Sequence, residues 1–230
     1  MIIIGEFEVE FLQIGQDQAT EPILAFHGFG RVIQDFKVFE RLLRPGQVIY
    51  SFHLFQHGKS SFPAERIALD SLTTKEHVVI IDAICQHLNI KTFHLIGYSL
   101  GGKIALKTLE LLPDRVTGIL LIAPDGVKIN NFYKFVSGTS LGRAIYRGIL
   151  KNPKPLFRSA DFLRAIRLLP EKLHRFVYFH MESYEKRKLV GEVWMIYRFF
   201  DPNIPDIQRI IKQHTNGEYI LIFPFCSKKH

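Results

Sequence analysis

Residues 93–102 read FHLIGYSLGG, and this stretch decides the fold that we expect for the chain. A short apolar run ends at Gly97, and a helix-like pattern begins directly after Ser99. The stretch therefore predicts a buried strand that turns sharply into a helix, with the serine at the turn. Gly97 and Gly101 flank Ser99 because so tight a turn leaves no room for side chains there.

The Gly-x-Ser-x-Gly spacing at 97–101 is that of a nucleophile elbow, in which a strained turn points a serine hydroxyl into a cleft. The motif alone is weak evidence, but a buried strand before it and a helix after it are the context that supports it. Ser99 is therefore the candidate nucleophile. It needs a base, usually histidine, and a carboxylate that orients the base. The amide of Leu100, where the helix starts, is a candidate oxyanion donor.

A second glycine loop, HGFG at 27–30, follows another short apolar run at 22–26. Small residues let backbone N–H groups approach a substrate closely. The amide of Phe29 is the second candidate donor to an oxyanion. We expect His27 to fix this loop by hydrogen bonds rather than to catalyse, because it immediately precedes the glycine.

Short apolar runs alternate with stretches of helical spacing along the first half of the chain. The expected strands are 22–26, 48–52, 93–97 and 118–123, and the expected helices are 36–43, 74–88 and 100–112. This alternation predicts an α/β fold, in which a mainly parallel sheet has helices on both faces and binds ligands at the carboxyl ends of its strands. Residues 2–14 alternate loosely and predict an edge hairpin.

Residues 126–200 break this rhythm, because they contain several helical patterns and no clear strand. We interpret this segment as a helical cap or lid inserted into the fold. The predicted organisation is a core formed by residues 1–125, a cap at 126–200, and the last helix and strand of the core within 201–230.

The composition indicates one globular domain with an insertion. The 230 residues are 47% hydrophobic, which suffices for one large core. No basic, signal-like N-terminus is present, and the apolar runs fall short of the roughly 18 to 20 residues that a membrane helix needs. The only cysteines, Cys85 and Cys226, lack metal-ligand spacing and predict reduced thiols in the cytoplasm. No cofactor or metal is expected.

The positive charge is concentrated in the expected cap. The chain has a formal net charge of +8, and residues 126–200 contain 15 Lys and Arg against 5 Asp and Glu. Such a segment predicts contact with an anionic surface, or else only a solvated face. No nucleic-acid-binding motif accompanies it, so nucleic acid is not an expected partner.

Together these motifs resemble the alpha/beta-hydrolase fold family, in its lidded branch of esterases, lipases, peptidases and carbon–carbon bond hydrolases. The resemblance covers residues 1 to about 225 and implies Ser99 as the nucleophile, with the amides of Phe29 and Leu100 as the oxyanion hole. It also implies that the cap shapes substrate choice. The matching segments are the oxyanion loop at 27–30, the Gly-x-Ser loop at 57–60, the elbow at 97–101 and the sixth strand at 118–123.

The chain departs from the family at its C-terminal end. In the family the seventh strand usually runs into Gly-x-x-Asp, which supplies the acid, whereas Ser227 stands at that position here. The family then adds a helix, a strand, a catalytic histidine and a last helix, where this chain has only residues 228–230. We therefore expect a C-terminally shortened member.

Two residues are substitute candidates for the acid and the base. Asp125 lies two residues beyond Ala123, where some family members carry the acid, and turn chemistry in 124–126 favours a turn role for it over that of the acid. His230 is the candidate base near the expected edge of the sheet. Three further histidines have no motif support, namely His174, His180 and His214.

Two functions follow from these observations. The first is a serine hydrolase that cleaves an ester, amide or related acyl bond through an acyl-enzyme on Ser99. The alternative is a truncated or pseudo-hydrolase that binds a small molecule without turnover. Aromatic residues of the cap predict an apolar acyl or aromatic ligand, although such residues also pack cores; they are Phe132, Tyr133, Phe135, Tyr146, Phe176, Tyr178 and Trp194.

Overall fold

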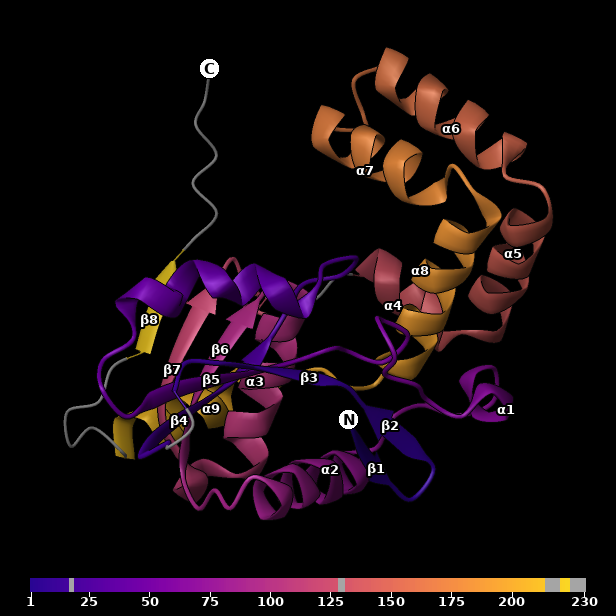
Figure 1. Cartoon of the computed structure of the whole chain (residues 1–230). Coiled ribbons are helices and arrows are strands. Elements are labelled where there is room, and N and C mark those ends of the chain that lie inside the picture. The colour runs from indigo at the N-terminus through magenta and orange to yellow at the C-terminus, as the bar shows by residue number, and fades with distance from the viewer. Residues whose placement is uncertain (17–18, 128–130, 214–219, 224–230) are drawn as a thin grey trace. The chain divides into compact units, whose positions relative to one another are not determined.

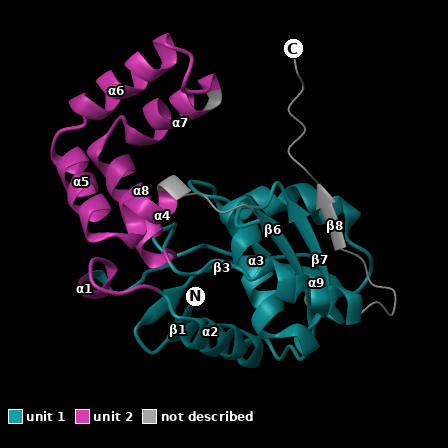
Figure 2. Cartoon of the chain, turned by 180° about the vertical axis from the view of Figure 1, so that it is seen from behind, with its two compact units in different colours: residues 1–64, 72–129, 199–230 teal, residues 65–71, 130–198 magenta. Residues whose placement is uncertain are grey.

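The computed structural model of the chain describes residues 1–16, 19–127, 131–213 and 220–223. The chain forms two compact units, which Figure 2 shows in different colours. Unit 2 contains an additional short segment, 65–71, that lies outside the insertion expected at 126–200. Unit 1 consists of residues 1–64, 72–129 and 199–230, and unit 2 of residues 65–71 and 130–198.

Unit 1 is built on a six-stranded sheet in the order β3-β5-β4-β6-β7-β8 (Figure 1). Five of these strands run parallel, and β3 pairs antiparallel with β5 at one edge. The mainly parallel sheet predicted from the alternating pattern is therefore confirmed. The strands are β3 (Phe11–Ile14), β4 (Glu21–Phe26), β5 (Gln47–Phe52), β6 (Phe93–Tyr98), β7 (Val116–Ile122) and β8 (Ile220–Phe223).

The N-terminal residues form less of a hairpin than the alternation predicted. Only β1 (Ile2–Ile4) and β2 (Phe7–Val9) pair with each other, as a separate two-stranded sheet. The segment that follows, β3, joins the main sheet instead, where Phe11 lies opposite Phe52. The rings of these two residues are 5.7 Å apart, and such aromatic cross-strand pairs stabilise a sheet.

Helices cover both faces of the sheet, as predicted (Figure 1). On one face η1 (Ile33–Leu42) contacts β3 and β5, and its Phe36 belongs to a core cluster with Ile23, Ile49 and Ile96. On the other face α3 (Leu100–Leu111) contacts β4, β6 and β7, and α2 and α9 pack against α3. The remaining helices of this unit are α2 (Thr74–His87), η2 (Pro113–Arg115) and α9 (Ile204–Gln213).

Unit 2 is helical, as its sequence predicted. Its core is built around Tyr146, whose hydroxyl donates to the carbonyl of Arg187 over 2.7 Å and whose ring lies 6.1 Å from that of Trp194. The Trp194 ring also packs edge-on against Tyr133 at 5.5 Å. The helices assigned to this unit are α4 (Asn131–Gly138), α5 (Ser140–Lys151), α6 (Lys154–Ala165), α7 (Glu171–Met181) and α8 (Tyr184–Ile196), with most of the short α1 (Ala64–Ile67).

No helix in the described part of the chain has both the length and the low polarity that a membrane crossing requires.

Gly101→Ala tests the close contact between the first turn of α3 and the end of β4. A Cβ at this position would overlap the backbone carbonyl of Phe26, so we expect a loss of about 3 kcal/mol in the free energy of unfolding, the upper part of the range for overpacking. The matched control is Gly148→Ala in helix α5, where a Cβ would meet nothing within 4 Å. Alanine there should add about 0.5 to 1 kcal/mol through helix propensity alone.

Urea unfolding followed by circular dichroism measures both variants. Both positions are helical, so alanine brings the same gain in helix propensity to each. The difference between the two variants in the free energy of unfolding therefore measures the cost of the overlap at Gly101. A Gly101→Ala protein as stable as the wild type would contradict the contact.

Candidate functional site

Ser99 lies in the turn between β6 and α3, at the carboxyl end of a central strand. Its backbone has a φ of 51° and a ψ of −117°, values that residues other than glycine rarely adopt. Strain of this kind costs roughly 1 to 3 kcal/mol and clusters at functional sites. Two backbone hydrogen bonds hold the turn, because Ser99 N donates to the carbonyl of Ile122 over 3.0 Å and Gly102 N donates to the carbonyl of Ser99 over 2.8 Å.

Close backbone packing surrounds this turn. A Cβ on Gly97 would lie 2.6 Å from the carbonyl oxygen of Gly101, and a Cβ on Gly101 would overlap the carbonyl of Phe26 at the end of β4. Both glycines are therefore required by space, as the sequence predicted. The contact brings the first turn of α3 against the loop that follows β4.

The 27–30 loop lies beside Ser99. A Cβ built on Gly28 would come within 3.2 Å of the Ser99 Cβ and within 2.9 Å of the Tyr98 ring. Phe29 follows in the same loop, and Leu100 is the first residue of α3. Three residues predicted from sequence, Ser99, Phe29 and Leu100, thus lie on two adjoining loops at the carboxyl edge of the sheet.

Three buried histidines support the 27–30 loop, namely His27, His53 and His57. The ring centroid of His27 lies 5.1 Å from that of His53 and 5.0 Å from that of His57. His53 was not singled out from the sequence, and His57 was noted only as part of the Gly-x-Ser loop. The signal that could have found them is that β4 and β5 are parallel neighbours, so that the loops after them meet at one edge.

Hydrogen bonds fix the protonation of two of these rings. Nε2 of His57 accepts from the amide of Gly30 over 2.9 Å, so the His57 proton is on Nδ1, which faces a backbone carbonyl 3.1 Å away. Nε2 of His27 accepts from the amide of Leu54 over 3.3 Å, and its Nδ1 donates to the carbonyl of Gly28 over 2.7 Å. Each ring therefore ties the loop in its neutral form.

Burial keeps this cluster neutral. Loss of hydration lowers the pKa of His27 to about 3 and lowers the pKa values of His53 and His57 as well. Protonation would also place a proton on Nε2 of His27 or His57, opposite an amide that already donates there. His27 is therefore built to hold the loop, in agreement with the role expected for it.

Asp125 lies close to the elbow through its backbone. Its amide donates to the carbonyl of Ser99 over 2.9 Å. Its carboxylate accepts from the amide of the next residue, Gly126, over 2.8 Å, which is the hydrogen bond of a turn residue. The backbone of Asp125 thus lies near Ser99, as a catalytic acid would require, but its carboxylate is engaged as in a turn residue. The described contacts therefore favour the turn.

The histidines considered as bases fall into two groups. His230 and His214 lie outside the described residues, as does Ser227. His174 and His180 belong to α7 in unit 2, where Nε2 of His174 donates to Asp161 Oδ1 over 2.8 Å. No described histidine forms a hydrogen bond with the Ser99 hydroxyl.

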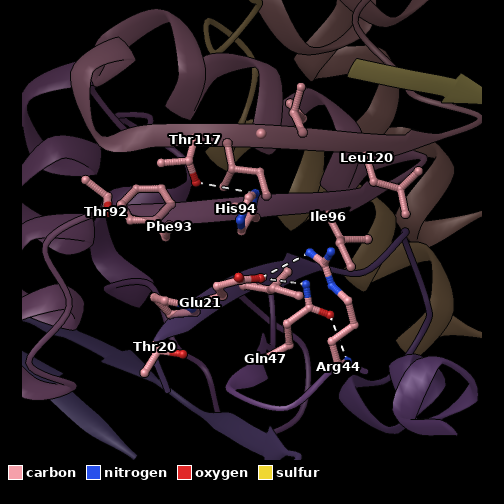
Figure 3. Close-up of a pocket in the computed structure, with 15 residues that line it drawn as sticks. Thr20, Glu21, Arg44, Gln47, Thr92, Phe93, His94, Ile96, Thr117 and Leu120 are labelled. Atoms are coloured by element: carbon pink, nitrogen blue, oxygen red, sulfur yellow. Dashed lines mark hydrogen bonds and ion pairs between the residues drawn. The ribbon is translucent and has the colours of Figure 1, made fainter. Parts of the chain in front are cut away.

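A cavity of about 460 Å³ in unit 1 lies at the opposite edge of the sheet, near the amino ends of β4, β6 and β7 (Figure 3). Glu21 lies on its wall and accepts hydrogen bonds from Gln47 Nε2 over 2.9 Å and from Arg44 over 3.2 Å. His94 lies on the other side, with its Nδ1 3.3 Å from the hydroxyl of Thr117. Because Ser99 follows the carboxyl end of β6, this cavity is distinct from the candidate site.

The neutral histidines predict acid sensitivity. The pKa of His27 is about 3 in the folded chain and about 6.5 when unfolded, so the unfolded chain binds the extra proton at intermediate pH. The contribution of neutral His27 to the free energy of unfolding is complete above about pH 6.5 and is lost as the pH falls toward 3. At pH 5 the loss amounts to about 2 kcal/mol. The buried His77, with a pKa also lowered to about 3, should contribute similarly.

Urea unfolding at about pH 7 and about pH 5 measures this loss. His27→Gln and His77→Gln should each remove a share of it, whatever their stability at neutral pH, and the double variant should lose the least on acidification. An unchanged pH dependence in the double variant would show that these rings are not held neutral.

Known proteins are similar to this chain in part of its sequence and in its fold. The profile of the alpha/beta hydrolase fold family matches residues 21–183. The chain is 31% identical over 124 residues to a dihydrolipoyllysine-residue acetyltransferase component of an acetoin cleaving system from Pseudomonas putida, covering 54% of this chain and 32% of that protein. It is 30% identical over 113 residues to a putative esterase/lipase from Haemophilus influenzae, covering 49% of this chain and 37% of the relative.

The chain thus matches about a third of the length of these relatives. Its fold is also similar to that of a probable hydrolytic enzyme from Pseudomonas aeruginosa, with a TM-score of 0.61 and 18% identity over 94% of this chain and 68% of that one. The strand-turn-helix at Ser99 and the adjoining 27–30 loop lie within the matched residues. The chain belongs to the alpha/beta hydrolase fold family.

Proposed function

We propose that the protein is a serine hydrolase that cleaves an ester, amide or related acyl bond of a small molecule through an acyl-enzyme on Ser99. The observation that carries this proposal is the strained backbone of Ser99 at the start of α3, with the glycine loop beside it. Strain is retained where function needs the side chain in one place. The name of the Haemophilus influenzae relative, a putative esterase/lipase, supports the same class of bond.

The amides of Phe29 and Leu100 are the proposed oxyanion donors. Leu100 begins α3, so its N–H belongs to the positive end of a helix dipole. Phe29 stands between two residues that the histidines hold, because His27 donates to the Gly28 carbonyl and Gly30 donates to His57. A fixed donor needs no reorganisation as negative charge develops, and one such donor contributes roughly 3 kcal/mol to transition-state stabilisation.

Asp125 and His230 are the proposed acid and base. The backbone of Asp125 adjoins that of Ser99, and one oxygen of its carboxylate is engaged by Gly126. A base that takes the proton from Ser99 would return it to the leaving group, and the carboxylate would orient that base. We place the protein in the cytoplasm. Its proposed substrate carries an apolar acyl or aromatic group.

The competing proposal is a binding protein in which the pocket persists without turnover. It is supported by the absence of a hydrogen bond between the Ser99 hydroxyl and any described histidine. Without a base, serine is a poor nucleophile at neutral pH. The two proposals therefore differ in the reactivity of one hydroxyl group.

Reaction with a fluorophosphonate probe separates them. We expect covalent labelling at Ser99, mapped by peptide mass spectrometry, and no labelling of Ser99→Ala. Ser159→Ala, which changes an exposed serine on α6, is the matched control and should label like the wild type. If a reference hydrolase labels and this chain does not, the hydrolase proposal fails, and saturable binding of an apolar ester without hydrolysis would then support the binding protein.

Gly28→Ala tests the role of the loop. The added methyl group would lie 3.2 Å from the Ser99 Cβ, where it would crowd any group that approaches the hydroxyl. We expect the labelling rate to fall at least about tenfold, because small displacements at a reacting centre cost about 100-fold. Thermal unfolding checks that the variant is folded, and an unchanged rate would show that the loop does not border the reacting atoms.

A further inference from the structure

Helices α6 and α7 form a helical hairpin in unit 2 (Figure 2). Their contact consists of polar and aromatic groups. Asp161 accepts hydrogen bonds from His174 over 2.8 Å and from the hydroxyl of Tyr178 over 2.7 Å, and the rings of Phe157 and Tyr178 lie 4.7 Å apart. These hydrogen bonds and the ring contact hold the two helices together.

The turn between the helices is ordered. The amides of Leu168 and Leu169 both donate to the carbonyl of Leu163, over 2.8 and 3.1 Å. Arg167 closes the turn with a φ of 59°. The hydrogen bonds satisfy the end of α6 as a helix C-cap does, and they leave the side chains of the turn free to point outward.

Several large apolar side chains of this hairpin are exposed. Phe162 is 64% exposed, Leu168 at the turn is 70% exposed, and Phe179 on α7 is 61% exposed. Large apolar side chains gathered this way mark an interaction surface. We call the following exposed side chains the apolar rim: Phe162, Leu163, Ile166, Leu168, Leu173, Phe176 and Phe179.

The same segment is strongly basic. Residues 151–175 contain seven Lys and Arg against two acidic residues. Both acids have partners, because Asp161 bonds to His174 and Glu171 pairs with Arg175 at 2.6 Å. Arg158 and Arg167, in contrast, have no ion pair with any described carboxylate. The charge left over is positive, and Arg158 lies about one helical turn before Phe162 while Arg167 adjoins Leu168 in the sequence.

Exposed aliphatic and aromatic side chains, together with arginines that pair with no described carboxylate, fit one chemical partner, an anionic lipid surface. Amphipathic helices with Leu and Phe on one side and Lys or Arg beside them lie in the interface of a bilayer, where they bury the apolar groups and pair the cations with lipid phosphates. A nucleic acid would pair the cations but would leave Leu168 and Ile166 without an apolar partner.

We propose that the α6–α7 hairpin is an interfacial membrane-binding element, which inserts the apolar rim into the outer part of an anionic bilayer. The binding is independent of chemistry at Ser99, so this proposal stands or falls separately from the proposed hydrolase. Its affinity combines burial of the rim with attraction between Arg158 and Arg167 and the lipid charge.

Flotation of the full chain with vesicles tests the proposal. The protein should bind vesicles of phosphatidylcholine with about 30 mol% phosphatidylglycerol far better than phosphatidylcholine alone. Arg158→Gln with Arg167→Gln should weaken binding to the anionic vesicles about 30-fold, from roughly fivefold per cation. Phe162→Ser with Leu168→Ser should weaken it at least about tenfold, because each buried apolar side chain contributes substantially.

Matched controls come from η1 in unit 1. Val38→Ser with Leu42→Ser changes two side chains that are 72% and 74% exposed, and Lys37→Gln with Arg41→Gln removes two exposed charges. Both controls should bind vesicles like the wild type, as should Ser99→Ala. Circular dichroism confirms that each variant keeps its helices.

Three outcomes would overturn the proposal. The first is a folded wild type that does not float with anionic vesicles. The second is equal loss in the hairpin variants and the η1 controls, which would indicate non-specific charge or adhesion. The third is self-association that disappears in Phe162→Ser with Leu168→Ser while vesicle binding persists, which would assign the rim to a second copy of this chain.

Discussion

The contact between the first turn of α3 and the end of β4 is the constraint on which the candidate site depends. It has no space for a Cβ at Gly101, because the carbonyl of Phe26 occupies that place. Backbone therefore packs on backbone, and the loop after β4 is brought against Ser99 with no intervening side chain. A larger residue at Gly101 would separate the serine from the amide of Phe29, which is proposed as an oxyanion donor.

The histidine cluster extends this constraint to the neighbouring strand. His57 and His53 follow β5, and His27 follows β4, so their contacts join the ends of two parallel strands. An imidazole that accepts from a backbone amide must be neutral, and burial ensures this by lowering its pKa. The loop is thus held by rings in one protonation state, and protonation of His27 or His57 would break the hydrogen bond that a backbone amide donates to its Nε2.

Local signals explain what the sequence could predict. Gly97, Ser99 and Gly101 lie within five residues of one another. Together with the apolar run before them and the helical spacing after them, they suffice to predict the strand, the turn and the helix. The support of the loop is different, because His27 and His53 are 26 residues apart and meet only after β4 and β5 pair. Likewise β3 was predicted as part of a hairpin, since alternation shows that a strand has two faces and says nothing of its partner.

Helical spacing in unit 2 is similarly limited as a predictor. It predicts the helices but not which side of each helix packs against the rest of the unit. The buried side chains of this unit include Tyr146, Val190, Val193 and Ile196. Asp161 and its partners join α6 to α7 at the hairpin. Exposed side chains such as Phe162 and Leu168 leave apolar surface in contact with water, and at a bilayer interface burial of that surface becomes a gain in free energy.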